Sequence, residues 1–277
     1  MEKIIKTLSI LLIAGSTLFG GFFLDNGIGL KGMQMGGAYT ANPQGPDALF
    51  WNVANLANNS SNQAYVAYAQ KFDDVKEYQL MFNMALDERS AIGVAYFYSG
   101  VDNITQWSTA SQNMGTFSFI NQALLAGYSL KFSEAENVGI TAKFLGQRAI
   151  DQAGFFAMDL AYHRILFGDI SFGLVLQDIY ATGSDILPIV RAGLSKPFGE
   201  VTLAVDYIYS SIFQRGFYKL GVNYTGLKLV DLKAGYSDYD KLFYAGMSIN
   251  FNGINLDYLY SNPDLGTVHQ FGVGINF

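Results

Sequence analysis

From Gln63 onward, hydrophobic and polar residues alternate along the chain with the period of two that is typical of half-buried strands. In one such segment Leu203 and Val205 share one face, whereas Thr202 and Asp206 occupy the other. The alternation predicts strands at 63–71, 75–86, 89–98, 117–132, 137–150, 153–165, 168–178, 187–197, 199–210, 214–225, 227–237, 241–251, 253–261 and 267–277.

The predicted strands are even in number, and each is long enough to cross a bilayer when tilted. Tight turns alternate with longer loops, of which 100–116 and 179–186 are the longest. Outer-membrane barrels likewise have short periplasmic turns and longer outer loops. The last strand alternates up to its terminal Phe277, which resembles the recognition signal of such barrels. We therefore expect an all-β fold, a transmembrane antiparallel β-barrel of about 14 strands.

The composition supports a membrane location for this barrel. Half of the 277 residues are hydrophobic, 15% are aromatic and only 14% are charged. A soluble domain has about 25% charged residues, so much of the apolar surface here needs a lipid-facing wall. Beyond the N-terminus, no stretch reaches the roughly 18 consecutive apolar residues of a membrane helix. The formal charge of −6 argues against a nucleic-acid partner.

The first 62 residues differ from the rest of the chain. Lys3 and Lys6 precede a short apolar core and then small residues up to Gly20, as in a secretory signal peptide. Residues 21–62 are rich in Gly, Asn and Ala and show little alternation. We expect a signal peptide at 1–20, an N-terminal plug or hatch at 21–62 and the barrel at 63–277, in the bacterial outer membrane.

The expected plug contains two motifs, MGGAYTA at 35–41 and ALFWNVANLA at 48–57. They resemble the start of the PorV/PorQ family of outer-membrane proteins, which is similar to the FadL-type transporters of hydrophobic compounds. Val53 stands where that family has proline, Asn55 where it has glycine, and Gln44-Gly45 where it has an acidic pair. The resemblance implies passage of small hydrophobic molecules across the outer membrane. Two alternatives stay open: a PorV-like binding module that works with a protein secretion system, and a purely structural barrel.

Six residues of these motifs are candidates for seating the plug: Met35, Gly36, Gly37, Ala38, Trp51 and Asn52. The two glycines permit positive φ and close packing against a wall. The Trp-Asn pair offers a large apolar anchor with polar handles. The alternative is a surface extension of the chain, against which its apolar content argues.

Eight charged residues share the polar parity of the predicted strands and are candidates for lining the lumen: Lys143, Asp159, Arg191, Asp206, Lys219, Asp231, Lys233 and Asp257. A Lys or Arg on the lipid face near mid-membrane costs about 2–4 kcal/mol, so an inward position avoids that cost. Such side chains pair with each other and with the plug, or they line a polar route. Their balance of four bases and four acids argues against strong selectivity for either ion sign.

Catalytic and metal-binding signatures are weak. The two histidines, His163 and His269, fall on different strands, and no cluster of metal ligands accompanies them. A GxGxxG pattern at 27–32 lacks the preceding strand of a nucleotide site, and no GxSxG motif occurs. We expect no enzyme activity, cofactor or metal. We expect a monomer surrounded by outer-membrane lipid, with hydrophobic small molecules or secretion-system proteins as further partners.

Overall fold

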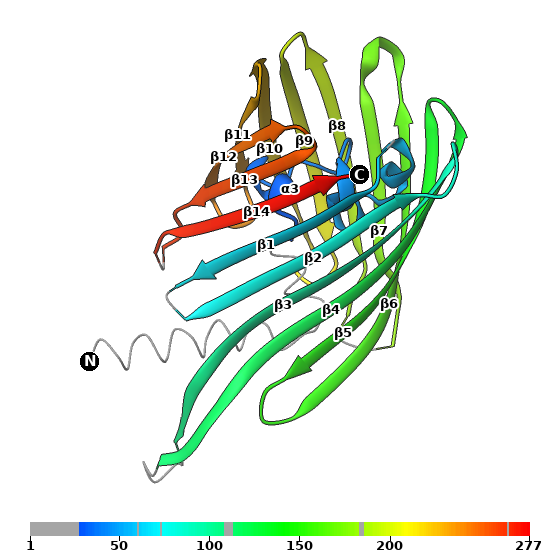
Figure 1. Cartoon of the computed structure of the whole chain (residues 1–277). Coiled ribbons are helices and arrows are strands. Elements are labelled where there is room, and N and C mark those ends of the chain that lie inside the picture. The colour runs from blue at the N-terminus through cyan, green and yellow to red at the C-terminus, as the bar shows by residue number, and fades with distance from the viewer. Residues whose placement is uncertain (1–27, 60, 73, 108–112, 183–185, 265) are drawn as a thin grey trace.

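The computed structural model describes residues 28–277 except 60, 73, 108–112, 183–185 and 265. The described strands form a closed antiparallel barrel in which each strand pairs with its neighbours in sequence (Figure 1). The first and last strands close the ring, because Gln63 pairs with Asn276 and Gln70 with His269. The predicted 14-stranded all-β barrel is therefore confirmed.

The strand bounds follow the predicted pattern closely. The strands are β1 Gln63–Lys71, β2 Val75–Ala85, β3 Ser90–Trp107, β4 Asn113–Ser133, β5 Glu136–Arg148, β6 Gln152–Ile165, β7 Ser171–Ala181, β8 Ile189–Phe198, β9 Val201–Ser210, β10 Arg215–Leu227, β11 Val230–Ser237, β12 Leu242–Phe251, β13 Ile254–Ser261 and β14 Val268–Asn276. We call the end where β1 begins and β14 ends the terminal end, and the opposite end the loop end.

The two faces of the wall have opposite chemistry. Along β9 the side chains of Leu203, Val205 and Tyr207 are exposed, whereas Asp206 and Ile208 are buried. An outer surface of aliphatic side chains is unfavourable in water and favourable in lipid, and this accounts for the outward apolar face. Strand parity alone predicts this division, since successive side chains point to opposite faces.

Aromatic side chains on the outer face gather at two levels. A row near the loop end crosses five neighbouring strands through registered pairs, from Tyr258 and Phe271 to Tyr68, Tyr78 and Tyr98. The ring centroids lie 5.2 Å apart for Tyr258 and Phe271, 5.2 Å for Tyr68 and Tyr78, and 5.8 Å for Tyr78 and Tyr98. Near the terminal end further aromatic pairs form, including Phe82 with Phe277 and Tyr162 with Phe172. Two aromatic levels with aliphatic residues between them are typical of a membrane belt.

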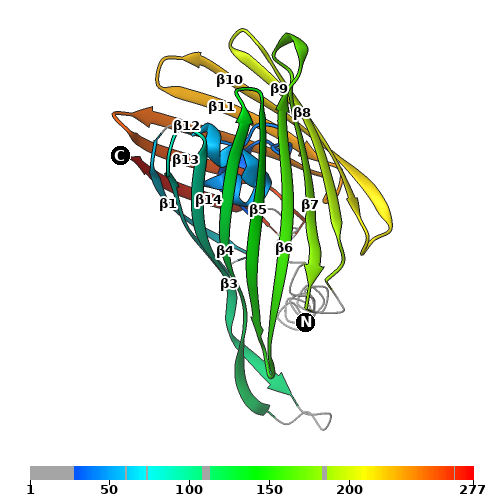
Figure 2. The ribbon, with the colours of Figure 1, turned by 90° about the vertical axis from the view of Figure 1, so that its right-hand side faces the viewer.

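The predicted loop at 100–116 is wrong. β3 continues to Trp107 and β4 begins at Asn113, so the two strands project past the loop end of the barrel as a long hairpin (Figure 2). A bulge between Val101 and Ile104, where Asn103 has a φ of 58°, shifts the register. The bulge interrupts the period of two, which is why the pattern did not predict these strand residues. The predicted loop at 179–186 is also shorter, because β7 extends to Ala181.

The segment from 28 to 59, which we call the inner segment, lies inside the barrel (Figure 2). It contains four short helical elements: α3 Leu30–Gln34, η1 Gly45–Asp47, α4 Ala48–Trp51 and η2 Val53–Asn58. Its apolar residues are almost fully buried; Leu30, Trp51 and Leu56 have no exposed surface. η2 packs against β3–β6, and α3 packs against β11–β14 across the lumen. The inner segment thus bridges opposite walls.

Two further points concern the start of the chain. The predicted signal peptide at 1–20 and the first residues of the predicted plug, 21–27, lie outside the described residues. Where the structure describes the chain, no helix has the length and apolar character needed to span a membrane.

Candidate functional site

Paired glycines on the inner wall make room for the inner segment. Gly93 pairs with Gly127, Gly173 with Gly193, and Gly221 with Gly235, each across two neighbouring strands. A Cβ on Gly235 would overlap the backbone nitrogen of Gly36, and one on Gly173 would overlap the carbonyl oxygen of Thr40. We call these six wall glycines the glycine seat. Because no side chain fits there, the inner segment lies directly against the wall, with the side chain of Leu49 at Gly93 and Gly127 and with its backbone at the other four glycines.

The MGGA motif forms the turn after α3. Gly36 and Gly37 have φ values of 64° and 80°, which residues with a Cβ rarely adopt. Their N–H groups donate to the carbonyl oxygens of Met33 and Gly32 at 2.9 Å. A Cβ on Gly36 would lie 2.5 Å from the backbone nitrogen of Tyr236 in β11. Both the turn and the close approach therefore require these glycines; the flanking Met35 and Ala38 are buried.

Trp51 lies at the centre of the inner segment. Its ring packs edge-on against Phe50 at 5.1 Å and Tyr39 at 6.3 Å. Two wall cations approach the ring, with the guanidinium carbon of Arg191 at 5.5 Å and the Nζ of Lys219 at 5.6 Å from its centroid. A cation held over an aromatic ring is attracted by its negative face. Trp51 therefore connects the inner segment to β8 and β10.

Asn52 connects three parts of the molecule through its side chain. Its Nδ2 donates to the carbonyl oxygens of Thr40 at 2.9 Å and of Tyr162 in β6 at 3.0 Å. Its Oδ1 accepts the N–H of Ala54 at 3.2 Å. The amide is 1% exposed, so these bonds form away from water, where an unpaired polar group is costly.

Further hydrogen bonds join the inner segment to the wall on several sides. The Oδ2 of Asp206 accepts the N–H groups of Tyr39 at 3.1 Å and Thr40 at 2.9 Å. The Nε2 of Gln34 donates to the carbonyl oxygens of Met247 and Tyr258 at 3.1 and 3.0 Å. Ser129 of β4 donates to the carbonyl oxygen of Ala54 at 2.6 Å. The inner segment is therefore bonded to walls that face one another.

The structure places all eight predicted lumen-lining residues on the inner face of the wall. Six of them are buried: Lys143, Asp159, Arg191, Asp206, Lys219 and Asp257. The other two, Asp231 and Lys233, line a pocket near the terminal end. Lys143 pairs with Asp159 at 2.7 Å, and the Nζ of Lys233 donates to Gln34 of the inner segment at 3.0 Å. That any of the eight serves a polar route stays a prediction.

One buried charge escaped the sequence pattern. The carboxylate of Asp178 lies 2.5 Å from the Nζ of Lys143, although strand parity assigns it to the lipid face beside Leu176. A register shift between Met158 and Leu160 of the partner strand, together with a φ of 56° at Asp178, turns the side chain inward. An acidic residue directly after the inward Gln177 is the signal that could have indicated a bulge.

The inner segment carries a buried carboxyl group of its own. Asp47 in η1 has no exposed surface. Burial raises the pKa of this carboxyl from 3.8 to about 7, and the nearby charge of Lys31 opposes that shift. Desolvation dominates because a charged carboxylate is poorly stabilised away from water.

The lumen differs on the two sides of the inner segment. Towards the loop end, apolar side chains from β3, β4, β5 and β7 form one cluster with Phe50: Phe97, Leu125, Leu145 and Val175. Leu125 and Val175 lie two positions nearer the loops than the seat glycine of the same strand, and Phe97 lies four positions nearer. Leu145 lies four positions nearer the loops than Thr141, which pairs with the seat glycine Gly127. A hydrophobic molecule entering from the loop end would pass the inward Asn121 and Gln147, which are paired nearer the loops, before it reached these side chains. We call Phe50 and the four apolar wall residues the apolar cluster.

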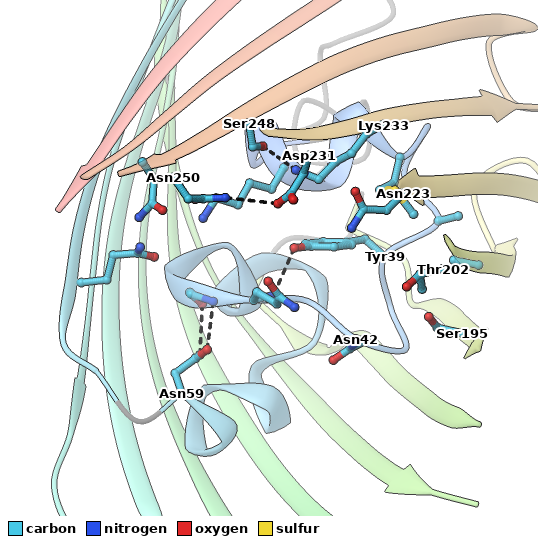
Figure 3. A pocket seen from close by; sticks show the side chains of 18 of the residues that line it. Tyr39, Asn42, Asn59, Ser195, Thr202, Asn223, Asp231, Lys233, Ser248 and Asn250 are labelled. Atoms are coloured by element: carbon cyan, nitrogen blue, oxygen red, sulfur yellow. Dashed lines mark hydrogen bonds between the residues drawn. The ribbon is translucent and has the colours of Figure 1, made fainter. Parts of the chain in front are cut away.

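Towards the terminal end the lumen is polar. A pocket of about 240 Å³ opens there, lined by the inner segment and by strands β8–β14 and β1 (Figure 3). Its lining contains many amide side chains, including Asn42, Asn59, Asn223 and Asn250 (Figure 3). We call it the polar pocket.

The two histidines lie far from one another in the fold. His163 is 2% exposed on the inner face of β6, and His269 is exposed on the outer face, where its Nδ1 lies 2.7 Å from the Tyr258 hydroxyl. Across the described part of the chain, no group of three His, Cys, Asp or Glu side chains could hold a metal ion.

Several solved structures share this fold. The Pseudomonas putida toluene transporter TodX matches with a TM-score of 0.68 at 13% identity, over 90% of this chain and 97% of that one. The Ralstonia pickettii toluene transporter TbuX matches over the same shares with a TM-score of 0.66 at 14% identity. A Pseudomonas aeruginosa FadL homologue does so with a TM-score of 0.62 at 12% identity. At these identities the likeness concerns the fold alone. No family model and no curated protein matches this chain.

Proposed function

We propose that this protein lets small hydrophobic molecules pass across the bacterial outer membrane. The observation that carries the proposal is the apolar cluster, which lies on the loop side of an inner segment seated in a closed barrel. TodX and TbuX, whose fold is similar, are described as toluene transporters. The PorV/PorQ-like motif at 35–57 supports the same class of function, because that family resembles the FadL-type transporters.

The outer membrane is the location that fits this barrel. Its outer face carries an aliphatic band between two aromatic levels, and its last strand presents outward Phe271, Val273 and Ile275 up to the terminal Phe277. The short turns join the strands at the terminal end, as periplasmic turns do in outer-membrane barrels. We infer that the loop end faces the outside of the cell and the terminal end faces the periplasm.

We also propose that the inner segment acts as a plug against ions and polar solutes. Its support is the set of hydrogen bonds that joins it to facing walls: Asp206 accepts from Thr40, Gln34 donates to Met247, and Ser129 donates to Ala54. In planar bilayers the intact protein should conduct weakly. Deleting residues 30–58 should raise the conductance severalfold in a barrel that still shows heat-modifiable migration on gels. A folded deletion variant with unchanged conductance would place the barrier elsewhere.

Uptake of radiolabelled toluene by Gram-negative cells that carry the protein tests the transport function. The protein should add a saturable component that cells with an empty vector lack. Leu125→Asp places a charge in the apolar cluster and should remove most of this component. Ser237→Asp is the matched control, because it adds the same charge at a buried serine on the facing wall. Equal uptake by the wild type and Leu125→Asp would exclude the apolar cluster as the route.

A second candidate function rests on the projecting β3–β4 hairpin. Its described end carries Trp107 and Met114, which are 59% and 61% exposed. Large apolar side chains at an exposed tip are common at binding surfaces, which favours a module that holds another protein at the membrane. Trp107→Ser with Met114→Ser should leave toluene uptake unchanged under the transport proposal. Loss of a co-purifying secretion component in this variant, with uptake absent in the wild type, would favour the binding module instead.

A further inference from the structure

The polar pocket combines features that point to a ligand different from a hydrophobic passenger. It lies at the terminal end, beside the first residue of β1, Gln63, and the last residue of β14, Asn276. Figure 3 shows side chains from the wall and from the inner segment converging on the same space. The inner segment separates this space from the apolar cluster.

Amide groups dominate the lining. Eight amide side chains contribute to it: Asn42, Gln44, Asn59, Gln63, Asn223, Asn250, Asn255 and Asn276. Ser61, Ser195, Thr202 and Ser248 add hydroxyl groups to it. An amide both donates and accepts hydrogen bonds, and so does a hydroxyl group. A surface of this kind is complementary to a molecule that carries several hydroxyl groups.

Two amide oxygens of this lining lack a hydrogen-bond partner among the described residues. The Oε1 of Gln63 and the Oδ1 of Asn223 are both buried, and Gln63 as a whole is 6% exposed. The Nε2 of Gln63 is held by Asn276 at 2.5 Å, which fixes the orientation of the amide. A buried acceptor without a donor costs free energy, so a ligand whose hydroxyl groups donate to both oxygens would be stabilised there.

The charged groups of the pocket already have protein partners. The Nζ of Lys233 donates to Gln34 and Ser248, and Asp231 accepts a hydrogen bond from Asn250 at 3.2 Å. Lys31 lies 5.5 Å from the ring of Tyr65. With two lysines and one aspartate the lining is nearly balanced in charge, which favours an uncharged ligand over a strongly charged one.

An aromatic ring stands inside the pocket. Tyr39 projects into the space between the wall and the inner segment, and its hydroxyl accepts the N–H of Gln44 at 3.2 Å (Figure 3). Its ring can cover the apolar C–H face of a sugar. The volume of about 240 Å³ is below the roughly 300–1,000 Å³ of pockets for drug-sized ligands, so the occupant is small. We propose that the polar pocket binds a small, uncharged, polyhydroxylated molecule of monosaccharide size from the periplasmic side.

Saturation-transfer NMR on the full chain in detergent micelles tests this proposal. The probes are D-glucose, D-galactose and N-acetyl-D-glucosamine, with gluconate as the charged comparison and toluene as the hydrophobic one. At least one neutral sugar should give a saturable signal, gluconate should bind at least tenfold more weakly, and toluene should not displace the sugar. Folding of each variant is checked by heat-modifiable migration.

Two variants and a control locate the signal. Ala204→Trp fills the pocket from β9 and should abolish binding. Asn223→Leu with Asn250→Leu removes two amides and should weaken binding about tenfold, which corresponds to two modest hydrogen bonds. Gln122→Leu removes an exposed amide outside the pocket and should leave binding unchanged. The proposal is overturned if no neutral sugar saturates the folded protein, if gluconate binds equally well, or if the signal survives in Ala204→Trp.

This proposal does not rest on the transport function. Its variants lie on the terminal side of the inner segment, whereas Leu125→Asp lies on the loop side. Toluene uptake without sugar binding would overturn the sugar site alone. Sugar binding without toluene uptake would overturn the transport function alone.

Discussion

The carboxylate of Asp206 accepts the backbone N–H of Thr40 at 2.9 Å and thereby fastens the inner segment to β9. The same oxygen accepts the N–H of Tyr39 at 3.1 Å, and the side chain has no exposed surface. Hydrogen bonds to a charged acceptor contribute about 1.5–3 kcal/mol each, and this acceptor serves two donors. Asp206 is therefore the acceptor for two of the hydrogen bonds that hold the inner segment against the wall.

Replacing this carboxylate should loosen the inner segment. Asp206→Ala leaves two buried N–H groups without an acceptor and should raise single-channel conductance severalfold in planar bilayers. Asp206→Asn is the matched control, because it retains one carbonyl acceptor and should show an intermediate conductance. Equal, low conductance in wild type and Asp206→Ala would show that the carboxylate does not hold the inner segment in place.

The glycine seat should tolerate no side chain. In Gly235→Leu the new side chain would overlap Gly36 and displace the inner segment from β11. We expect faster proteolysis of the inner segment or loss of heat-modifiable folding. Ala234→Leu, one residue away, points outward and should behave like the wild type. If both variants resist protease equally, the close approach at Gly235 does not exist in the membrane.

The two faces of β9 should differ in their tolerance of charge. Val205→Arg places a guanidinium on the lipid face, at a cost of about 2–4 kcal/mol near mid-membrane, and should impair assembly. Ala204→Arg points into the polar pocket, where water can hydrate the charge. The fraction of heat-modifiable protein in outer-membrane preparations measures both. Similar assembly of the two variants would contradict the strand register.

Stability of the inner segment should fall as the pH rises. Asp47 has a pKa of about 7 when folded and 3.8 as an ordinary exposed carboxyl. Well below pH 4 both forms are protonated and stability is highest. Between pH 4 and 7 the unfolded form loses its proton and the folded form keeps it, so stability declines, by on the order of 4 kcal/mol. Urea midpoints in micelles at pH 4.5 and 8 measure the decline.

Asp47→Asn provides the control for this pH dependence. The amide has nearly the same shape and stays neutral, so the variant should be less sensitive to pH and at least as stable as the wild type at pH 8. An undiminished pH dependence in Asp47→Asn would assign the effect to another group.

The sequence alone determined the strands and their two faces. Side chains alternate strictly along a strand, so the lipid-facing and inward residues are separated locally, as with Val205 and Asp206. The glycine pair of the MGGA motif was also recognisable, because positive φ and close packing are properties of the residue itself. Where a bulge breaks the period, at 101–104 and at Asp178, local alternation no longer predicts the structure.

Only the tertiary structure decided how residues far apart in sequence meet. The six glycines of the glycine seat are spread from 93 to 235 and have no distinguishing neighbours in the sequence. The polar pocket draws its amides from the inner segment and from strands on both sides of the β1–β14 closure. The separation of an apolar loop side from a polar terminal side follows from the register of all the strands around the barrel. That register is a property of the closed ring, because the height of each strand is fixed by its pairing with both neighbours.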